Sequence, residues 1–300
     1  MLLPFAQGSG WALDRYELTG ARAIYGTVLK ARITEGQTLL DLARKFGIGY
    51  NQITAANPSV DPWVPEPGID VLIPKIVVLP RGLLPEGITI NLAEMRLFFT
   101  KRGSGGRTLL YTCPIGIGRS GFSTKTGLYT VRSKAEDPTW YVPESIRRLE
   151  PDLPPVVPPG PDNPLGRYIL RFSRHAYGIH GTNRPLGIGR RVSHGCIRCY
   201  PEDIEQLYPL VEVGSLINIV YEPIKAVYQD GSCWLQVFED YENRLQDPFS
   251  AALMAVDQCR QEAALLGREG LKVDLRALKQ TVSEHTGLPV AVTGVKGPES

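Results

Sequence analysis

The sequence has almost no net charge, no long apolar run and few cysteines, and each shortage excludes a class of protein. Its 33 Lys and Arg residues nearly balance 31 Asp and Glu residues, and no dense basic run appears. Charge therefore gives no support to binding of nucleic acid or of an acidic lipid surface. No apolar run approaches the roughly 20 residues of a membrane helix, so no membrane span is expected. Five cysteines are an odd number, so disulfides cannot use all of them.

The composition is instead that of a folded chain with many turns. Hydrophobic residues make up 43% of the 300 residues, which is enough for a core, and 25 prolines and 31 glycines supply turns. A chain of this length predicts about two domains. Residues 1–6 are apolar but include a proline, and no basic side chain precedes Arg15. This start does not match a secretory signal, which needs a basic region and a longer apolar run.

After an extension over 1–29, residues 30–79 predict a small α+β module. A short strand leads to apolar residues at helical spacing over 39–46, and Gly47 ends that helix. A second helix over 50–56 stops before Asn57-Pro58, and a turn then leads into a closing strand. This β-α-α-β unit resembles a LysM module, which binds the N-acetylglucosamine-containing glycan of cell walls; a plain spacer is the alternative. The matching residues are Gly36, Leu39, Ala43, Phe46, Asn57, Pro67, Gly68, Ile73 and Pro74.

Residues 80–222 predict strands, and residues 223–300 predict a helical C-terminal subdomain. Apolar residues alternate at period two in the first part, and the clearest are Ile88, Ile90, Leu92, Met95, Leu97 and Phe99. Seven of the fourteen residues over 151–164 are proline, and we interpret this stretch as a long loop over the sheet. In the last part, 250–267 and 274–287 have the caps and glycines of two helices.

Chemically active side chains gather between residues 179 and 198. They are His180, His194, Cys196 and Arg198. A thiol attacks only as its thiolate, so Cys196 needs a base or a cation beside it. His180 precedes it by 16 residues, at the end of a strand-like run, and a strand–loop–strand return would bring imidazole and thiol together. Gly195 allows a tight turn whose N–H groups face a developing oxyanion. Arg198 adds positive charge near the thiolate or a substrate carboxylate.

Three other interpretations of this cluster compete. Cys196 and Cys199 form a C-x-x-C pair, as in thioredoxin-type redox sites, although the βαβ context of that motif is lacking. The two cysteines and two histidines could bind zinc, although the H-x-E and P-C-x-x-C patterns of deaminase-type sites are absent. Both histidines could also be ordinary polar residues at a sheet edge.

The cluster resembles the signature of YkuD-type L,D-transpeptidases. The matching stretches are His180-Gly181-Thr182-Asn183, Gly187-Ile188-Gly189 and Ser193-His194-Gly195-Cys196-Ile197-Arg198. Residues 90–97, 114–118 and 159–166 match as well, and the similarity extends from about Lys30 to the C-terminus. It is closest to the group that attaches Braun-type lipoprotein to peptidoglycan. The resemblance implies a mainly β fold, with a β-sandwich-like catalytic domain over 80–222.

The resemblance also implies a cysteine-dependent acyl transfer on peptidoglycan. Cys196 would attack the carbonyl between the diamino acid at position three and D-Ala at position four of a stem tetrapeptide. D-Ala would leave, and an amine would resolve the thioester. His180 would be the general base, with its ring oriented by the Gly181 carbonyl. The remaining candidates are Ser193, His194, Gly195 and Arg198 around the thiol, and Tyr177, Asn183 and Asn163 for binding substrate.

The implied partners are peptidoglycan stem peptides and glycan, and no metal or cofactor is required. The accepting amine would be the C-terminal lysine of a lipoprotein or the diamino acid of another stem, and water would make the enzyme an L,D-carboxypeptidase. Such a substrate implies a periplasmic location, although no signal peptide is visible. A non-catalytic peptidoglycan-binding protein is the alternative from another class. A papain-like peptidase is disfavoured because its cysteine precedes its histidine and lies on a helix.

Cys199 departs from the family pattern, which usually has an apolar residue at that position. A disulfide between Cys196 and Cys199 would silence the nucleophile in an oxidising compartment. The active form therefore either needs a thiol reductant as partner or has a local geometry that keeps the two cysteines apart.

Overall fold

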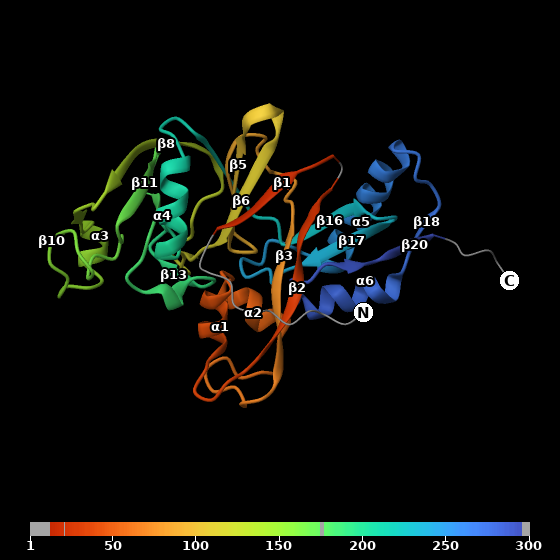
Figure 1. The fold of residues 1–300 in the computed structure, drawn as a ribbon, viewed down its shortest axis with the longest axis horizontal. Coiled ribbons are helices and arrows are strands. Elements are labelled where there is room, and N and C mark those ends of the chain that lie inside the picture. The colour runs from red at the N-terminus through yellow and green to blue at the C-terminus, as the bar shows by residue number, and fades with distance from the viewer. Residues whose placement is uncertain (1–12, 21, 175–176, 296–300) are drawn as a thin grey trace.

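A computed structural model describes residues 13–20, 22–174 and 177–295, so the apolar start over 1–6 lies outside the described residues. The chain is mainly β and is built around a nine-stranded sheet (Figure 1). The strands, in sheet order, are β1 (Asp14–Leu18), β6 (Thr108–Pro114), β5 (Arg96–Arg102), β4 (Gly87–Asn91), β15 (Leu216–Val220), β8 (Gly127–Glu136), β11 (Tyr168–Phe172), β12 (Gly178–His180) and β14 (Ile197–Arg198). Neighbours are antiparallel except for β15 with β4 and β12 with β14.

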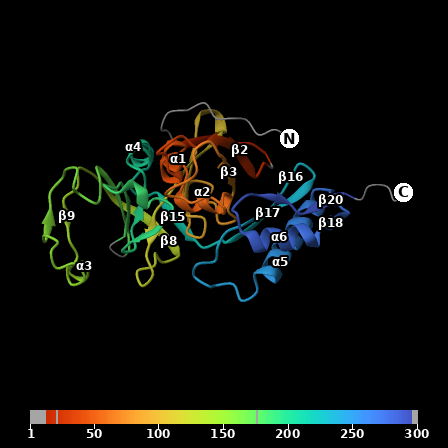
Figure 2. The same ribbon diagram turned by 90° about the horizontal axis from the view of Figure 1, so that it is seen from below.

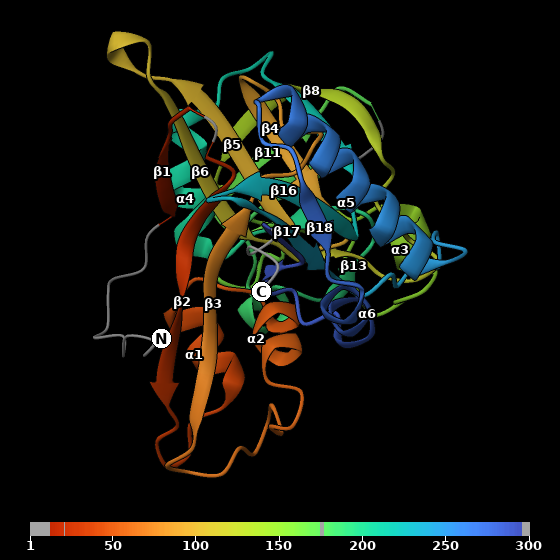
Figure 3. The same ribbon diagram turned by 90° about the vertical axis from the view of Figure 1, so that its right-hand side faces the viewer.

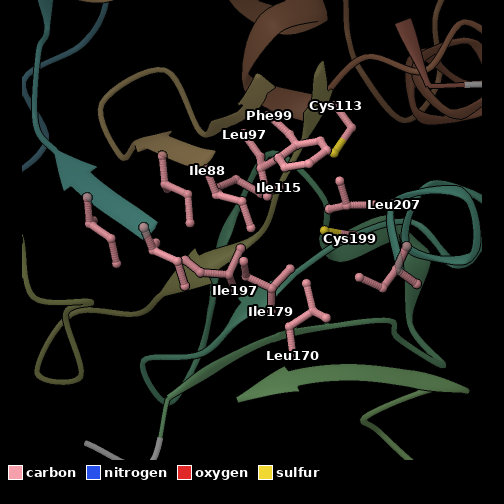
Figure 4. Packing of buried hydrophobic residues seen from close by; sticks show 14 of the residues in the cluster. Ile88, Leu97, Phe99, Cys113, Ile115, Leu170, Ile179, Ile197, Cys199 and Leu207 are labelled. Carbon is pink, nitrogen blue, oxygen red and sulfur yellow. The ribbon is translucent and has the colours of Figure 1, made fainter. Parts of the chain in front are cut away.

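The sheet curls until its two ends meet around one core. β6 and β14 are seven strands apart in sheet order, which would separate them by roughly 34 Å in a flat sheet. Instead Gly116, just after β6, exchanges two backbone hydrogen bonds of 2.8 Å with Arg198 of β14. Side chains from both ends share one cluster, among them Leu97, Cys113, Leu170, Ile179 and Ile197 (Figure 4). The predicted alternation is confirmed in β4 and β5, where Ile88, Ile90, Leu97 and Phe99 face this core.

The N-terminal module, residues 24–78, has the predicted β-α-α-β order. It consists of β2 (Ile24–Arg32), α1 (Leu39–Lys45), α2 (Tyr50–Ala56) and β3 (Asp70–Val78) around its own small core. α1 begins at a capping box in which Thr38 and Asp41 satisfy each other's backbone N–H groups. β2 starts earlier than expected, within the predicted extension over 1–29. The extension also supplies β1, which pairs with β6 of the large sheet.

The C-terminal subdomain contains the two predicted helices but is not simply helical. α5 (Pro248–Leu265) and α6 (Leu275–Glu284) pack on a sheet formed by β16 (Ile224–Gln229), β17 (Ser232–Val237) and β19 (Val290–Ala291). A second pair is β18 (Leu271–Val273) with β20 (Thr293–Val295). The helical expectation therefore needs correction to a mixed α+β unit. β16 and β17 form a hairpin around the two-residue turn Asp230-Gly231, a local signal, whereas the pairing of β17 with β19 joins residues more than fifty positions apart.

The proline-rich stretch belongs to a flap, residues 137–167, rather than to a loop lying over the sheet. It contains β9 (Trp140–Tyr141), α3 (Glu144–Arg147) and β10 (Val156–Val157), and β9 pairs with β10. Figure 2 shows β9 and α3 at the end of the molecule, away from the large sheet. The flap is closed at its base by a hydrogen bond of 2.7 Å from Asp137 N to Arg167 O. The prolines restrict the backbone of the flap, which is not part of the large sheet.

The module, the large sheet and the C-terminal subdomain meet at a buried ion pair. Lys225 of β16 donates to Glu94, in the turn between β4 and β5, at 2.8 Å, and to the carbonyl of Val78 in β3 at 2.7 Å. The side chains of Lys225 and Glu94 are 1% and 2% exposed. Figure 3 shows β2 and β3 running from the helices of the module towards the sheet, with β16 and β17 beside them. Within the described residues, no helix is both long and apolar enough to span a membrane.

Candidate active site

The parallel pair β12 and β14 decides which side chains share a face. Ile179 lies opposite Ile197, and His180 lies opposite Arg198. Successive side chains of a strand point to opposite faces, so the two isoleucines point into the core, where both are fully buried. His180, Arg198 and Cys196 therefore share the other face, with Cys196 two positions before Arg198. A backbone contact from Gly178 to the Cys196 thiol fits the same register.

His180 is buried and is held by the backbone. Its Nδ1 lies 2.7 Å from the carbonyl oxygen of Gly181, to which it donates when neutral, as predicted. Burial and, to a smaller extent, the positive charge of Arg198 together lower the pKa of His180 to about 4, against the opposing effect of the Gly181 and Leu165 carbonyls. The imidazole is thus neutral near pH 7, and its Nε2 is the nitrogen able to take a proton.

A clamped turn carries Cys196. The Ser193 hydroxyl donates to the carbonyl of Cys196 at 2.5 Å and accepts from the N–H of Gly195 at 3.1 Å. Gly195 has φ +106°, a backbone conformation that favours glycine, and a Cβ there would lie 2.6 Å from the ring of Tyr177. Thr124 donates to the Gly195 carbonyl at 2.9 Å from behind. The N–H of Gly195 is therefore used inside the turn, which corrects the expectation that it faces an oxyanion.

The thiol of Cys196 and its cationic neighbour are both largely enclosed. Burial raises the pKa of Cys196, while the Gly178 backbone and the charge of Arg198 lower it. Burial likewise lowers the pKa of Arg198. The Nε of Arg198 is buried and has no hydrogen-bond partner within the part of the chain that the structure describes. Arg198 thus supplies a positive charge beside both the thiol and the imidazole.

His194 is turned towards a loop rather than serving as a second base. Its Nε2 lies 2.8 Å from the guanidinium of Arg119, and its ring meets Phe122 edge to face at 4.8 Å. An arginine only donates, so this nitrogen accepts and the ring is neutral. Burial lowers the pKa of His194, and Arg119 lowers it further. The loop after β7 (Ile117–Gly118) is tied to the turn a second time, by Arg119 N donating to Ser193 O at 2.9 Å.

The two predicted substrate-binding asparagines take different positions. Asn163 is 1% exposed, and its amide donates to the carbonyls of Pro138, Val157 and Pro158 at 2.8, 3.3 and 3.1 Å. It ties the flap together and has no group directed to solvent. Asn183 is exposed and donates to the Asp162 carbonyl at 2.9 Å, which joins the end of the flap to the segment after His180.

Cys196 and Cys199 are kept apart by the strand between them. Residues 197 and 199 face the core, so Cys199 is fully buried on the side opposite to Cys196. Its thiol meets that of Cys113 instead, as Figure 4 shows. None of the five cysteines, all of which lie in the described residues, forms a disulfide. Because the C-x-x-C cysteines point to opposite faces, they cannot act together as a redox pair or as zinc ligands.

Sequence reasoning missed the loop behind the turn. Thr124 donates to the Gly195 carbonyl, Arg119 contacts Ser193 O and the His194 ring, and Phe122 packs against that ring. The two residues of each contact lie more than 70 positions apart in the sequence. The only available signal was the density of Gly, Ser and Thr after β7, which indicates a structured turn without naming its partner.

Comparison with known proteins identifies the family. A model described as the L,D-transpeptidase catalytic domain, YkuD, matches residues 85–219. A probable L,D-transpeptidase of Escherichia coli, ErfK/SrfK, is 38% identical over 80% of this chain and 82% of its own length. The Salmonella typhimurium protein of that name is 37% identical over 86% of this chain and 83% of its own length. The chain therefore belongs to the YkuD-type L,D-transpeptidase family.

Two further findings extend the comparison. The probable L,D-transpeptidase YbiS of Escherichia coli is 36% identical over 86% of this chain and 85% of its own length. Among solved structures, the catalytic domain from the E. faecium L,D-transpeptidase matches 46% of this chain and 99% of that domain. It shares 23% sequence identity, with a TM-score of 0.35.

Proposed function

We propose that the protein is a cysteine-dependent L,D-transpeptidase of peptidoglycan, with Cys196 as nucleophile and His180 as general base. The observation that carries this proposal is the register of β12 and β14, which places the thiol, a backbone-held neutral imidazole and the Arg198 cation on one face. A thiol in such surroundings needs a base to form its thiolate, and His180 Nε2 is the nitrogen left for that role.

In the first half-reaction, Cys196 Sγ attacks the carbonyl carbon between the diamino acid and D-Ala of a stem tetrapeptide. The thiol proton passes to Nε2 of His180, and the imidazolium then gives that proton to the departing amine of D-Ala. The peptide C–N bond breaks as the thioester forms. The Gly181 carbonyl holds Nδ1–H at 2.7 Å throughout, so the ring keeps the orientation and tautomer that the transfer requires.

In the second half-reaction, an amine attacks the thioester carbon while Nε2 of His180 accepts its proton. The C–S bond then breaks, and the imidazolium returns the proton to the Cys196 thiolate. The tetrahedral oxyanion of both steps needs donors placed in advance. With the Gly195 N–H used inside the turn, we assign this role to the backbone N–H groups of His194 and Cys196. Arg198 adds positive charge on the same face and stabilises the negative charge of the thiolate or of a substrate carboxylate. We keep Tyr177 and Asn183 as substrate contacts and assign Asn163 to shaping the flap.

We further propose that the N-terminal module is LysM-like and binds the glycan, and that the protein works in the periplasm. The β-α-α-β order of the module and the cell-wall polymer as substrate support these two assignments. The preferred acceptor is a lipoprotein C-terminal lysine, as in the group whose motifs the sequence resembles. Because Cys196 and Cys199 point to opposite faces, we expect no disulfide that would block the Cys196 thiol. This disfavours a purely binding role, and it also disfavours the need for a thiol reductant.

The test is mass spectrometry of products formed from a disaccharide-tetrapeptide and a peptide ending in lysine. Wild-type protein should release D-Ala and join the two, and the Cys196→Ala variant should form neither product nor acyl-enzyme. Cys199→Ala is the matched control, because it removes a thiol three residues away on the other face. Release of D-Ala without joining would identify a carboxypeptidase. Absence of both product and acyl-enzyme in the wild type would refute the proposed function.

A further inference from the structure

The N-terminal module touches the segment that leads to the nucleophile. The N–H of Tyr50 donates to the carbonyl of Ile188 at 3.1 Å, and the N–H of Asn51 donates to the carbonyl of Gly189 at 3.2 Å. These are backbone-to-backbone bonds between the start of α2 and residues 187–190, which we call the approach loop. Contacts of this kind act directly on the path of the main chain, because both partners are backbone groups and no side-chain rotamer lies between them.

The contact requires glycine at position 189 and is tight at position 49. Gly189 has φ +76°, and a Cβ on it would lie 2.2 Å from the Tyr50 nitrogen. A Cβ on Gly49 would lie 3.0 Å from the Gly189 Cα. No real side chain fits at 2.2 Å, so the two backbones approach as closely as only glycine allows. A module connected only by a flexible tether would not need such an approach.

Side chains of the module also contact the approach loop. The Arg190 guanidinium lies over the rings of Tyr50 and Trp63, at 5.1 and 5.7 Å from their centroids. Both distances are within the range of cation–π attraction. The amide of Asn51 donates to the carbonyl of Glu94 at 3.0 Å, and Glu94 is the partner of the buried Lys225. The module is thus also bound to the turn between β4 and β5, next to the residues with which it holds the approach loop.

The approach loop connects directly to the catalytic turn. On its inner side, Gly189 N donates to Ile115 O and Ile117 N donates to Arg190 O, both at 3.0 Å. The chain then runs through β13 (Arg191–Ser193), which pairs with β7 and ends at the serine that clamps the turn of Cys196. The approach loop is therefore held between the module and the sheet, only a few residues before the thiol.

We propose that the module is a positioning part of the catalytic unit: residues 49–51 and Trp63 hold the approach loop, and through β13 they set the position of the turn that carries Cys196. This inference rests on the proposed role of Cys196. It assigns the module a task that does not depend on glycan, and it makes Tyr50, Gly189 and Arg190 positioning residues. A displacement of about 1 Å in reacting groups costs on the order of a hundredfold in rate, so a modest loosening should be measurable.

The experiment uses the full chain and a stem tetrapeptide that has no glycan, so that loss of wall binding cannot affect the rate. The variants are Gly189→Ala, which forces the backbones apart, and Arg190→Ala, which removes the cation from the two rings. Arg268→Ala is the charge-matched control, because Arg268 is exposed and lies in the C-terminal subdomain, outside the module, the approach loop and the turn of Cys196. Each rate is divided by the fraction of protein that is folded at the assay temperature, which thermal unfolding measures.

We expect both module-contact variants to lower kcat about tenfold or more, with KM within about twofold, and we expect Arg268→Ala to match the wild type. The rate at which iodoacetamide alkylates Cys196 should change in the same two variants, which tests the position of the turn even if no turnover occurs. If Gly189→Ala fails to fold, Arg190→Ala decides alone. Unchanged kcat and alkylation in Arg190→Ala, or a loss that only follows the folded fraction, would overturn the inference. An inactive wild type would refute the proposed function, and the alkylation rates would still decide this inference.

Discussion

We expect His180, the proposed general base, to stay neutral and active far below the pH at which an ordinary histidine becomes protonated. The pKa of His180 is lowered to about 4, chiefly because the ring is buried and also because Arg198 repels a second positive charge. The difference from the ordinary value of 6.5 corresponds to about 3 kcal/mol of free energy against protonation in the folded state. We therefore expect the acid limb of kcat/KM to lie near pH 4.

The same residue makes folding stability depend on pH. Between pH 6.5 and about 4, the unfolded chain takes up a proton at His180 and the folded chain does not. Stability therefore falls as the pH falls through this window, by up to about 3 kcal/mol from this group. Asp203 acts in the opposite direction, because burial raises the pKa of its carboxyl well above the ordinary value and acid favours its neutral folded form. The measurable quantity is the difference between wild type and His180→Asn.

The assay is the initial rate of D-Ala release from a tetrapeptide between about pH 4 and pH 8, with urea unfolding at the same pH values. Arg198→Gln is the companion variant: removing the cation raises the pKa of His180, so its acid limb should move to higher pH. Since burial is the larger cause, the limb should stop short of 6.5. A wild-type acid limb at 6.5, or identical pH dependence of stability in wild type and His180→Asn, would refute this reasoning.

Three further predictions follow from single contacts. Lys225→Met leaves Glu94 charged and buried, so it should cost about 3–5 kcal/mol of unfolding free energy. The double variant Lys225→Met, Glu94→Gln should recover most of that loss. An equal loss in the single and the double variant would argue against the ion pair. Mild oxidation should give no disulfide between Cys196 and Cys199, and peptide mapping under non-reducing conditions checks this. Ser193→Ala removes two hydrogen bonds from the turn of Cys196, so it should lower the free energy of unfolding by about 1–3 kcal/mol. It should also lower kcat more than it raises KM. An unchanged kcat would contradict a role of Ser193 in holding this turn.

Much of the fold and the site was open to prediction because it depends on local pattern. The helices of the module came from apolar spacing and from Gly47, and α2 occupies its expected residues. The orientation of His180 by Gly181 involves adjacent residues and is confirmed. The strands of the flap were not predicted, because a two-residue strand has too few side chains to show a period. The hairpin of β16 and β17 was open to prediction from its Asp230-Gly231 turn, but the pairing of β17 with β19 depends on residues more than fifty positions apart.

The sequence by itself determined which residues we propose for the chemistry, since a cysteine, a histidine and an arginine stand in a glycine-rich signature that resembles the family's. Tertiary structure alone decided how they are held. Curling of the sheet brings Gly116 to Arg198, and it also turns Cys199 towards Cys113 and away from Cys196. Docking of the module places Tyr50 against Ile188. These contacts join segments about 80 to 140 positions apart, and their energy comes from burial and backbone pairing that exist only once the chain has closed on itself.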